Sequence, residues 1–141
     1  MKVCDIMTDK VVAVSQQEPI AAAARLMKRH NLGALPVCDE DGRLRGIITD
    51  RDIVTRCVAV EMDPETKVRE IMSRGICSCG TEENVDTAAR TMSDEQVRRL
   101  PVLDNGRVVG MVSLCDLARN SGYNMEAAAA LSEISTNINR R

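Results

Sequence analysis

The stretches Gly46-Ile47-Ile48-Thr49-Asp50-Arg51-Asp52 and Gly110-Met111-Val112-Ser113-Leu114-Cys115-Asp116 are two versions of one pattern. Each has a glycine, two apolar residues, a hydroxyl residue and, three positions later, an aspartate. The likeness extends outward, because Ile-Met-Thr at 6–8 and Leu-Pro-Val at 35–37 return as Ile-Met-Ser at 71–73 and Leu-Pro-Val at 100–102. A duplicated sequence predicts a duplicated fold, and two copies favour a closed, pseudo-twofold unit over an open solenoid.

Size and composition narrow the class of protein. The chain has 141 residues, the size of one ordinary domain, and each repeat alone would be marginally stable. Aromatic residues make up 1% of the chain, so no aromatic platform is available for stacking on single-stranded nucleic acid. The net charge is −2, which provides no basic field for nucleic acid or an anionic membrane. We expect neither as a partner.

The N-terminus lacks the apolar core of a secretory signal, and no apolar run approaches the length of a membrane span. We therefore expect a cytoplasmic protein. In a reducing compartment, cysteines remain thiols and commonly serve as small apolar core residues. The chain has six: Cys4, Cys38, Cys57, Cys77, Cys79 and Cys115.

Hydrophobic periodicity predicts the order β-α-β-β-α in each repeat, after a short amphipathic opening turn. In the first repeat, the expected elements are a strand at 12–14, a helix at 19–30, strands at 35–38 and 44–48, and a helix from Thr49 toward Val60. In the second, they are a strand at 77–79, a helix at 84–96, strands at 100–103 and 108–112, and a helix from Ser113 toward Asn120. Asp41-Gly42 and Asn105-Gly106 are strong hairpin signals.

These elements give the expected domain boundaries. Residues 1–60 form the first repeat, 61–67 a linker, 68–122 the second repeat and 123–141 a helical tail. The tail includes the helix-favouring run 125–134, which has no counterpart in the first repeat. Two interpretations of this helix are open: it caps an edge or clasps a second subunit, or it is a frayed, solvent-facing end.

The glycine-to-aspartate pattern has a structural and a functional interpretation. It is a helix capping box, with Thr49 or Ser113 as N-cap and Asp52 or Asp116 three residues later. It also suits a ribonucleotide, because a carboxylate offers two acceptor oxygens to a ribose cis-diol while the hydroxyl and free N–H groups meet a phosphate. In the second interpretation, the glycine lets the chain turn closely.

The β-α-β-β-α repeat, the Ile-Met-Thr/Ser opening, the Leu-Pro-Val strand and the Gly-x-x-Thr/Ser-x-x-Asp junction together resemble the CBS (cystathionine β-synthase) domain family, as a tandem pair or Bateman module. The resemblance covers residues 1 to about 120. It implies an α/β (α+β) fold, with two repeats packed sheet to sheet about a pseudo-twofold axis, here followed by a C-terminal helix. It also implies two clefts that bind adenosine compounds such as AMP, ADP, ATP or S-adenosylmethionine, and a homodimer.

Carried over residue by residue, the resemblance places a ribose on Asp116 beside Ser113 in one cleft, and on Asp52 beside Thr49 in the other. It places the base against the first strand and the pre-proline strand of the opposite repeat. The implied contacts are the backbone of 11–13 and 34–35 with Asp116, and of 76–78 and 99–100 with Asp52. The candidate site residues in these segments are Val12, Ala13, Ala34, Cys77, Ser78 and Arg99.

The repeats differ where the resemblance implies phosphate contacts. Arg98 and Arg99 precede the second Leu-Pro-Val, where the first repeat has Gly33 and Ala34. The cleft reached by these arginines is expected to be the better anion site, and Arg51 and Arg56 are possible helpers in the other. The alternative is that Arg98 and Arg99 are ordinary solvated side chains.

No catalytic set is visible, so we expect no enzyme and no required cofactor. His30 is the only histidine and falls at an expected helix end, and Ser113 has no histidine in its own motif. The chain is predicted to be a regulatory adenosine-nucleotide-binding module that senses energy state or a metabolite and acts through a regulated protein partner or its own assembly.

Two alternatives stay open. Cys77 and Cys79 lie two apart on a strand and could serve a metal- or redox-responsive sensor, although Cys-x-x-Cys spacing is absent and core packing is the simpler explanation. No metal site is therefore assigned. The third possibility is a dimerisation scaffold that binds nothing, in which the hydroxyl and carboxylate residues only cap helices.

Overall fold

The computed structural model describes residues 1–120 and 124–139, and its internal contacts divide the chain into two compact units. The first-repeat unit comprises Val12–Ile76 and Gly106–Val108. The second-repeat unit comprises Met1–Val11, Cys77–Asn105 and Val109–Arg141. The first eleven residues therefore pack with the second repeat. Residues 68–76, which open the second repeat in the sequence, pack with the first repeat.

The first-repeat unit contains a three-stranded sheet in the order β1-β2-β3. Strand β1 runs parallel to β2, and β2 runs antiparallel to β3. The elements are β1 (Val14–Ser15), α2 (Ile20–His30), β2 (Ala34–Cys38), β3 (Leu44–Thr49), α3 (Asp50–Ile53), the π-helix η1 (Val54–Val58) and the 3₁₀ turn η2 (Val68–Glu70).

The second-repeat unit repeats this arrangement, with a sheet in the order β4-β5-β6 and β4 parallel to β5. Its elements are α1 (Val3–Ile6), β4 (Cys79–Gly80), α4 (Val85–Glu95), β5 (Arg99–Asp104), β6 (Arg107–Ser113), α5 (Leu114–Arg119) and α6 (Asn124–Asn139). The first two residues of β6, Arg107 and Val108, are counted with the first-repeat unit. The predicted α/β fold of two β-α-β-β-α repeats with an added C-terminal helix is confirmed.

Local chemistry sets the helix ends. Pro19 and Asn84 are the N-caps of α2 and α4, and the Asn84 side chain accepts a hydrogen bond from the N–H of Asp86. The aligned Asn31 and Gln96 end these helices in the left-handed conformation, at φ 55° and 60°. Four of the predicted helix boundaries are therefore correct to within a residue.

Two sequence-based predictions need correction. The first strand of each repeat lies later than predicted, at Val14–Ser15 and Cys79–Gly80, because parallel pairing to the next strand begins there. The last helix of the first repeat does not run as one α-helix toward Val60. It is four residues of α-helix followed by the π-helical segment Val54–Val58.

Each unit has its own aliphatic core. In the first-repeat unit it includes Ile20, Leu35, Ile48 and Val68. In the second-repeat unit it includes the fully buried Val3. Apolar burial of this kind stabilises by about 25 cal/mol per Å². Val3 and Val68, from the opening turns, are thus core residues of the unit that the other repeat builds.

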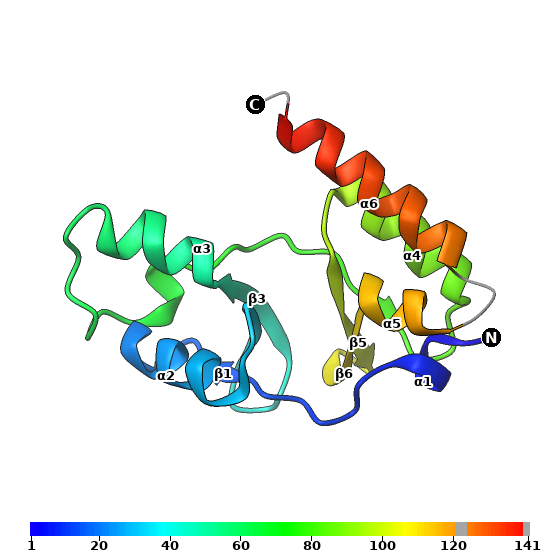
Figure 1. The fold of residues 1–141 in the computed structure, drawn as a ribbon. Helices are drawn as coiled ribbons and strands as arrows, with labels where there is room; N and C mark the ends of the chain where they lie inside the picture. The colour runs from blue at the N-terminus through cyan, green and yellow to red at the C-terminus, as the bar shows by residue number, and fades with distance from the viewer. Residues whose placement is uncertain (121–123, 140–141) are drawn as a thin grey trace. The chain divides into compact units, whose positions relative to one another are not determined.

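Helix α6 packs on its own unit. Figure 1 shows it running alongside α4 with α5 nearby, and Ala127, Ala130 and Ile134 are buried in the same core as α4 and α5. Ile134 is 2% exposed. The interpretation as a frayed, solvent-facing tail is therefore wrong over this part of the helix.

The part of the chain that the structure describes has no helix with both the length and the apolar character needed to cross a bilayer.

Candidate functional site

The two glycine-to-aspartate stretches form the junctions β3–α3 and β6–α5. In the first-repeat unit, the Thr49 N–H donates to Asp52 Oδ2 at 2.9 Å, and the Asp52 N–H donates to Thr49 Oγ1 at 3.0 Å. In the second, the Ser113 N–H donates to Asp116 Oδ2 at 2.8 Å, and the Asp116 N–H donates to Ser113 Oγ at 3.2 Å. Both junctions are full capping boxes.

These capping bonds use one carboxylate oxygen, Oδ2, and do not involve the other, Oδ1. Asp52 and Asp116 are buried, at 8% and 6% exposure, and Oδ2 of each points back into its own helix start. Because a carboxylate has about four acceptor positions, capping and ligand binding are compatible on the same residue. The structural and functional interpretations of the motif therefore do not exclude each other.

An arginine from the same helical segment faces the second oxygen in each repeat. Arg119 forms an ion pair and hydrogen bond with Asp116 Oδ1, and the Arg56 Nε lies 3.8 Å from Asp52 Oδ1. The Arg119 side chain is 71% exposed, so it can move into water at little cost. The Arg56 side chain is 51% exposed and its Nη1 also donates to the Ile71 carbonyl at 3.0 Å, so it is held more firmly. A ribose diol at either aspartate would replace this guanidinium.

The glycines of the motif act differently from our expectation. A Cβ on Gly46 would lie 2.7 Å from the Ser73 carbonyl oxygen, and one on Gly110 would lie 2.9 Å from the Thr8 carbonyl oxygen. The Ile47 and Met111 backbones exchange hydrogen bonds with Ser73 and Thr8. These glycines admit the opening segment of the other repeat rather than turning the chain toward a ligand.

The second-repeat unit brings three predicted site residues to one pocket. Arg98, Arg99 and Ser113 line a cavity of about 520 Å³ together with α5 and α6 residues, whereas Asp116 is not part of its lining. The Ser113 hydroxyl donates to Asp116 Oδ2 at 3.0 Å. An anion in this pocket would therefore meet the two guanidinium groups rather than the serine proton.

The remaining predicted site residues divide between the units. Val12, Ala13 and Ala34 lie in the unit of Thr49 and Asp52, while Cys77 and Ser78 lie in the unit of Ser113 and Asp116. The predicted pairing of base and ribose contacts joins residues of different units and stays a prediction. Arg51 is an exposed residue of α3.

The cysteine pair is part of the core. Cys79 is buried, its Sγ lies 3.8 Å from the Pro101 carbonyl oxygen, and burial raises the pKa of its thiol to about 12. Burial also raises the pKa of Cys77, which packs against the same core. Core packing therefore accounts for both cysteine positions.

Among residues 1–120 and 124–139, no group of three or more His, Cys, Asp or Glu side chains is placed to hold a metal ion.

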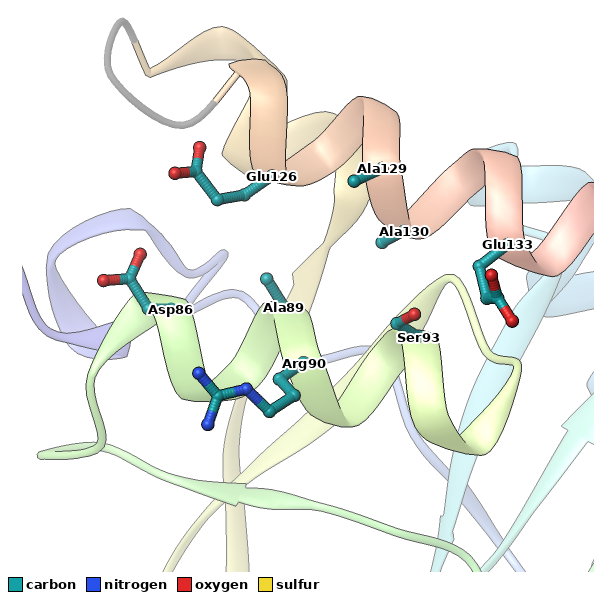
Figure 2. Close-up of a pocket in the computed structure, with 8 residues that line it drawn as sticks. All are labelled: Asp86, Ala89, Arg90, Ser93, Glu126, Ala129, Ala130 and Glu133. Atoms are coloured by element: carbon teal, nitrogen blue, oxygen red, sulfur yellow. The ribbon is translucent and has the colours of Figure 1, made fainter.

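A second hollow of about 500 Å³ lies between α4 and α6 (Figure 2). Ala89 and Ala130 form its floor, and Arg90 and three carboxylates surround it: Asp86, Glu126 and Glu133. It contains none of the predicted site residues. Sequence reasoning also missed the α5 and α6 residues of the first pocket, whose single signal was the alanine-rich run 127–130.

The fold and the two junctions define a tandem pair of β-α-β-β-α repeats, and the comparisons with known proteins give its family. The CBS domain family matches residues 3–59 and 68–122. The chain belongs to the CBS domain family, as a CBS pair.

Among individual relatives, CBS domain-containing protein YhcV of Bacillus subtilis is 44% identical over 131 residues, which are 93% of each chain. YhcV therefore has little sequence beyond the region that it shares with this chain. Hypoxic response protein 1 of Mycobacterium tuberculosis is 39% identical over 117 residues, 82% of each chain. These relatives are stand-alone CBS proteins of similar length.

Solved structures agree on the fold. Hypoxic Response Protein I, solved with two coordinated zinc ions, has a TM-score of 0.80 and 38% identity, covering 85% of this chain and 98% of that one. The CBS domain pair of MJ0100, solved with 5′-methylthioadenosine and S-adenosyl-L-methionine, has a TM-score of 0.76 and 34% identity, covering 84% and 94%. A hexameric CBS-CP12 protein from bloom-forming cyanobacteria has a TM-score of 0.75 and 31% identity, covering 89% and 73%.

Proposed function

We propose that this CBS pair is a regulatory module that binds an adenosine-containing ligand, with the ribose hydroxyls on Asp116 and, in the other repeat, on Asp52. The observation that carries the proposal is the state of these two buried carboxylates. One oxygen of each holds the helix start, while the other faces an exposed arginine that a diol can displace. The MJ0100 pair, a relative, binds ligands of this class.

The second repeat is the stronger candidate. Arg98 and Arg99 have no ion-pair partner in the described part of the chain, and they lie on the same side of β5 and α5 as Ser113. Two guanidinium groups favour a phosphate or carboxylate. The first repeat has Gly33 and Ala34 at these positions, so we expect weaker anion binding there.

A matched pair of variants tests the proposal. We would titrate AMP, ADP, ATP, S-adenosylmethionine and 5′-methylthioadenosine into the wild type, Asp116→Asn and Asp52→Asn, by calorimetry and by thermal unfolding. Asparagine keeps one oxygen for the capping bonds and replaces the other acceptor with a donor, so the fold should persist while the diol contact is lost. A ligand at 100 times its Kd adds about 2.7 kcal/mol to the free energy of unfolding.

The expected result is binding of at least one of the five compounds, lost in Asp116→Asn and retained in Asp52→Asn. Loss confined to Asp52→Asn would place the stronger site in the first repeat. Absence of binding by all five, or unchanged binding in both variants, would contradict the proposal.

Zinc is the competing ligand, because the related Hypoxic Response Protein I was solved with two zinc ions. We would include Zn²⁺ as a separate titration, with metal analysis of the purified protein. Binding of Zn²⁺ without any adenosine compound would favour the cysteine-sensor alternative, and binding of neither would favour a scaffold.

A regulatory module must pass ligand binding on to an oligomeric state or a protein partner. The related CBS-CP12 protein is a hexamer. We propose a homodimer that passes ligand occupancy to a protein partner. Light scattering with and without the bound adenosine compound measures the oligomeric state, and a monomer under both conditions would contradict this part.

A further inference from the structure

The last helical segment of the first repeat carries large apolar side chains that the described part of the chain leaves uncovered. Val54 and Val58 lie one turn apart on η1 and are 58% and 64% exposed. Arg51, also exposed, lies one turn earlier on α3. Residues at these spacings share one side of a helix. Arg51, Val54 and Val58 therefore form an exposed ridge, the valine ridge, and apolar side chains that stand together mark interaction surfaces.

The second repeat shows what covers the corresponding helices there. Helix α6 packs on α4 and α5, and Ala89 of α4 is 5% exposed. Ala24, the aligned residue of α2, is only partly buried. The sequence of the first repeat contains no counterpart of α6. The first repeat therefore lacks the helix that covers this surface in the second.

The helical sides of the two repeats also carry opposite charge. Helix α2 ends in Lys28-Arg29-His30, whereas the aligned end of α4 reads Ser93-Asp94-Glu95. Helix α2 contains three cations and no carboxylate, while α4 and α6 together contain five carboxylates and one arginine. Helices α2 and α3 are in contact, so the cations of α2 and the valine ridge belong to neighbouring helices. The first repeat thus presents a basic and apolar surface, and the second an acidic one.

The hollow between α4 and α6 suits this surface in shape and charge (Figure 2). Its floor is made of alanines, and small side chains let another helix approach closely. Carboxylates surround the floor, with Arg90 as the cation among them. In the described residues these carboxylates have no ion-pair partner: Asp86, Glu126 and Glu133. An aliphatic ridge flanked by cations is the shape that such a groove receives.

We propose that the valine ridge of one copy docks into the α4–α6 hollow of a second copy, and that the cations of α2 meet its carboxylates. The inference rests on the homodimer of the proposed function and deepens it, because it names the two surfaces and their order. The first repeat of each copy pairs with the second repeat of the other, so a closed dimer contains the contact twice. Pairing of first repeat with first repeat would bring like charges together.

Charge reversal tests this pairing on the full chain. Lys28→Glu with Arg29→Glu makes the first surface acidic, and Glu126→Lys with Glu133→Lys makes the second surface basic. All four side chains are exposed, so the fold should persist. Each double variant sets like charges against each other at both contacts. We expect either one to raise the dissociation constant of the dimer about tenfold or more in sedimentation velocity.

A control and a combined variant sharpen the test. Lys10→Glu with Arg74→Glu removes two exposed cations that belong to none of the helices α2, α4 and α6, and should leave the dimer unchanged. A chain that combines both charge reversals has its two surfaces exchanged in sign. In the proposed order it should associate with itself about as tightly as the wild type does, and it should not associate with the wild type.

The combined variant also distinguishes the order of the repeats. If first repeats paired with first repeats, the combined variant would associate with the wild type more tightly than with itself, because opposite charges would then meet. Energy transfer between labelled chains measures this mixed association. Such a preference for the wild type would overturn the inference.

Matched tryptophans on α6 test the shape of the contact. Ala129→Trp fills the hollow and is expected to weaken the dimer about tenfold or more. Ser132→Trp, at an exposed position of α6 that does not line the hollow, should leave it unchanged. Val54→Ser with Val58→Ser removes the apolar part of the ridge and should weaken the dimer as Ala129→Trp does. Equal effects of the two tryptophans would overturn the inference.

The outcomes separate this inference from the proposals on which it builds. A wild type that stays monomeric at all concentrations would contradict the homodimer and this inference with it. A dimer that none of the surface variants weakens would leave the homodimer standing and overturn the inference alone. Nucleotide binding is tested separately by Asp116→Asn, which changes neither surface.

Discussion

Asp39 illustrates how a single side chain organises a hairpin in one repeat only. Its Oδ1 accepts hydrogen bonds from the N–H groups of Asp41 and Arg43, and its Oδ2 pairs with Arg45 at 2.8 Å. The backbone hydrogen bond from Arg43 lowers the pKa of the Asp39 carboxyl most strongly, with Arg45 and Asp41 adding to the effect. The aligned Asp104 has no such hydrogen bond or ion pair in the described residues.

This difference predicts a pH dependence. A carboxyl whose pKa is lower in the folded protein than its unfolded value of about 3.9 stabilises the fold above that value, and the contribution disappears as pH falls through the folded pKa. We expect Asp39→Asn to lower the urea midpoint at pH 7, and we expect its difference from the wild type to shrink as pH falls below about 3.9. Asp104→Asn is the control and should show no such difference. An Asp39→Asn deficit that stays constant between pH 7 and acidic pH would contradict the prediction.

Gly46 and Gly110 show a second residue-scale requirement, close approach of two backbones. We expect Gly46→Ala to destabilise the protein by about 1–3 kcal/mol, because the new methyl group would overlap the Ser73 carbonyl and Met72. Gly80→Ala is the matched control, since a methyl group there would meet no atom within 4 Å and the φ of Gly80 is not in the left-handed region. Urea unfolding measures both, and equal stability of the two variants would refute the close-approach explanation.

At the scale of elements, α6 is the addition that distinguishes this chain's two repeats. It covers α4 and α5 with Ala127, Ala130 and Ile134, while Leu131 stays half exposed. We expect Ile134→Ala to cost about 2–4 kcal/mol, as for other buried large-to-small substitutions. Leu131→Ala should cost less than about 1 kcal/mol, because its side chain is already partly in water. Similar losses in urea unfolding for both variants would show that α6 does not pack in this register.

The prediction from sequence was most accurate for the positions of the longer helices. Helices α2 and α4 have strong apolar periodicity and end signals, and they were predicted almost to the residue. The two-residue strands β1 and β4 were misplaced, since parallel pairing partners are not visible in a local pattern. The π-helical segment was missed for a different reason. Its apolar residues Val54 and Val58 are spaced like those of an ordinary α-helix, so the local pattern does not distinguish the two.

For the candidate site, the sequence predicted the capping box of Ser113 and Asp116 but not the surroundings of these residues. The capping box was foreseen, whereas the arginine on the outer oxygen of each aspartate was not, because Arg56 and Arg119 stand four and three residues later, at ordinary helix spacings. The contribution of α6 to the Arg98 pocket depends on tertiary packing, which the repeat pattern does not contain.

At the scale of the whole molecule, the two units exchange their opening turns. Val3 donates its N–H to the Glu83 carbonyl at 2.8 Å and is buried with the second repeat, whereas Val68 donates to the Glu18 carbonyl at 2.8 Å and is buried with the first. Each unit is therefore completed by residues that lie outside its own repeat in the sequence.

A reciprocal pair of variants tests this exchange. We expect Val3→Ala to increase amide hydrogen exchange in α4 and β5, and Val68→Ala to increase it in α2 and β2, because each substitution leaves a cavity in the core that its side chain fills. Mass spectrometry of peptic fragments locates the change. Faster exchange in α2 and β2 after Val3→Ala, with α4 unaffected, would be incompatible with the assignment of the opening turn.

The exchange of opening turns also affects when residues 1–11 can pack during translation. Residues 1–11 leave the ribosome before the strands and helix of the second repeat against which they pack, by a delay on the order of seconds. During that interval Val3, Ile6 and Met7 have no finished surface to cover. A neighbouring nascent chain on the same message can offer that surface sooner, which gives newly made copies a route to swap their first eleven residues.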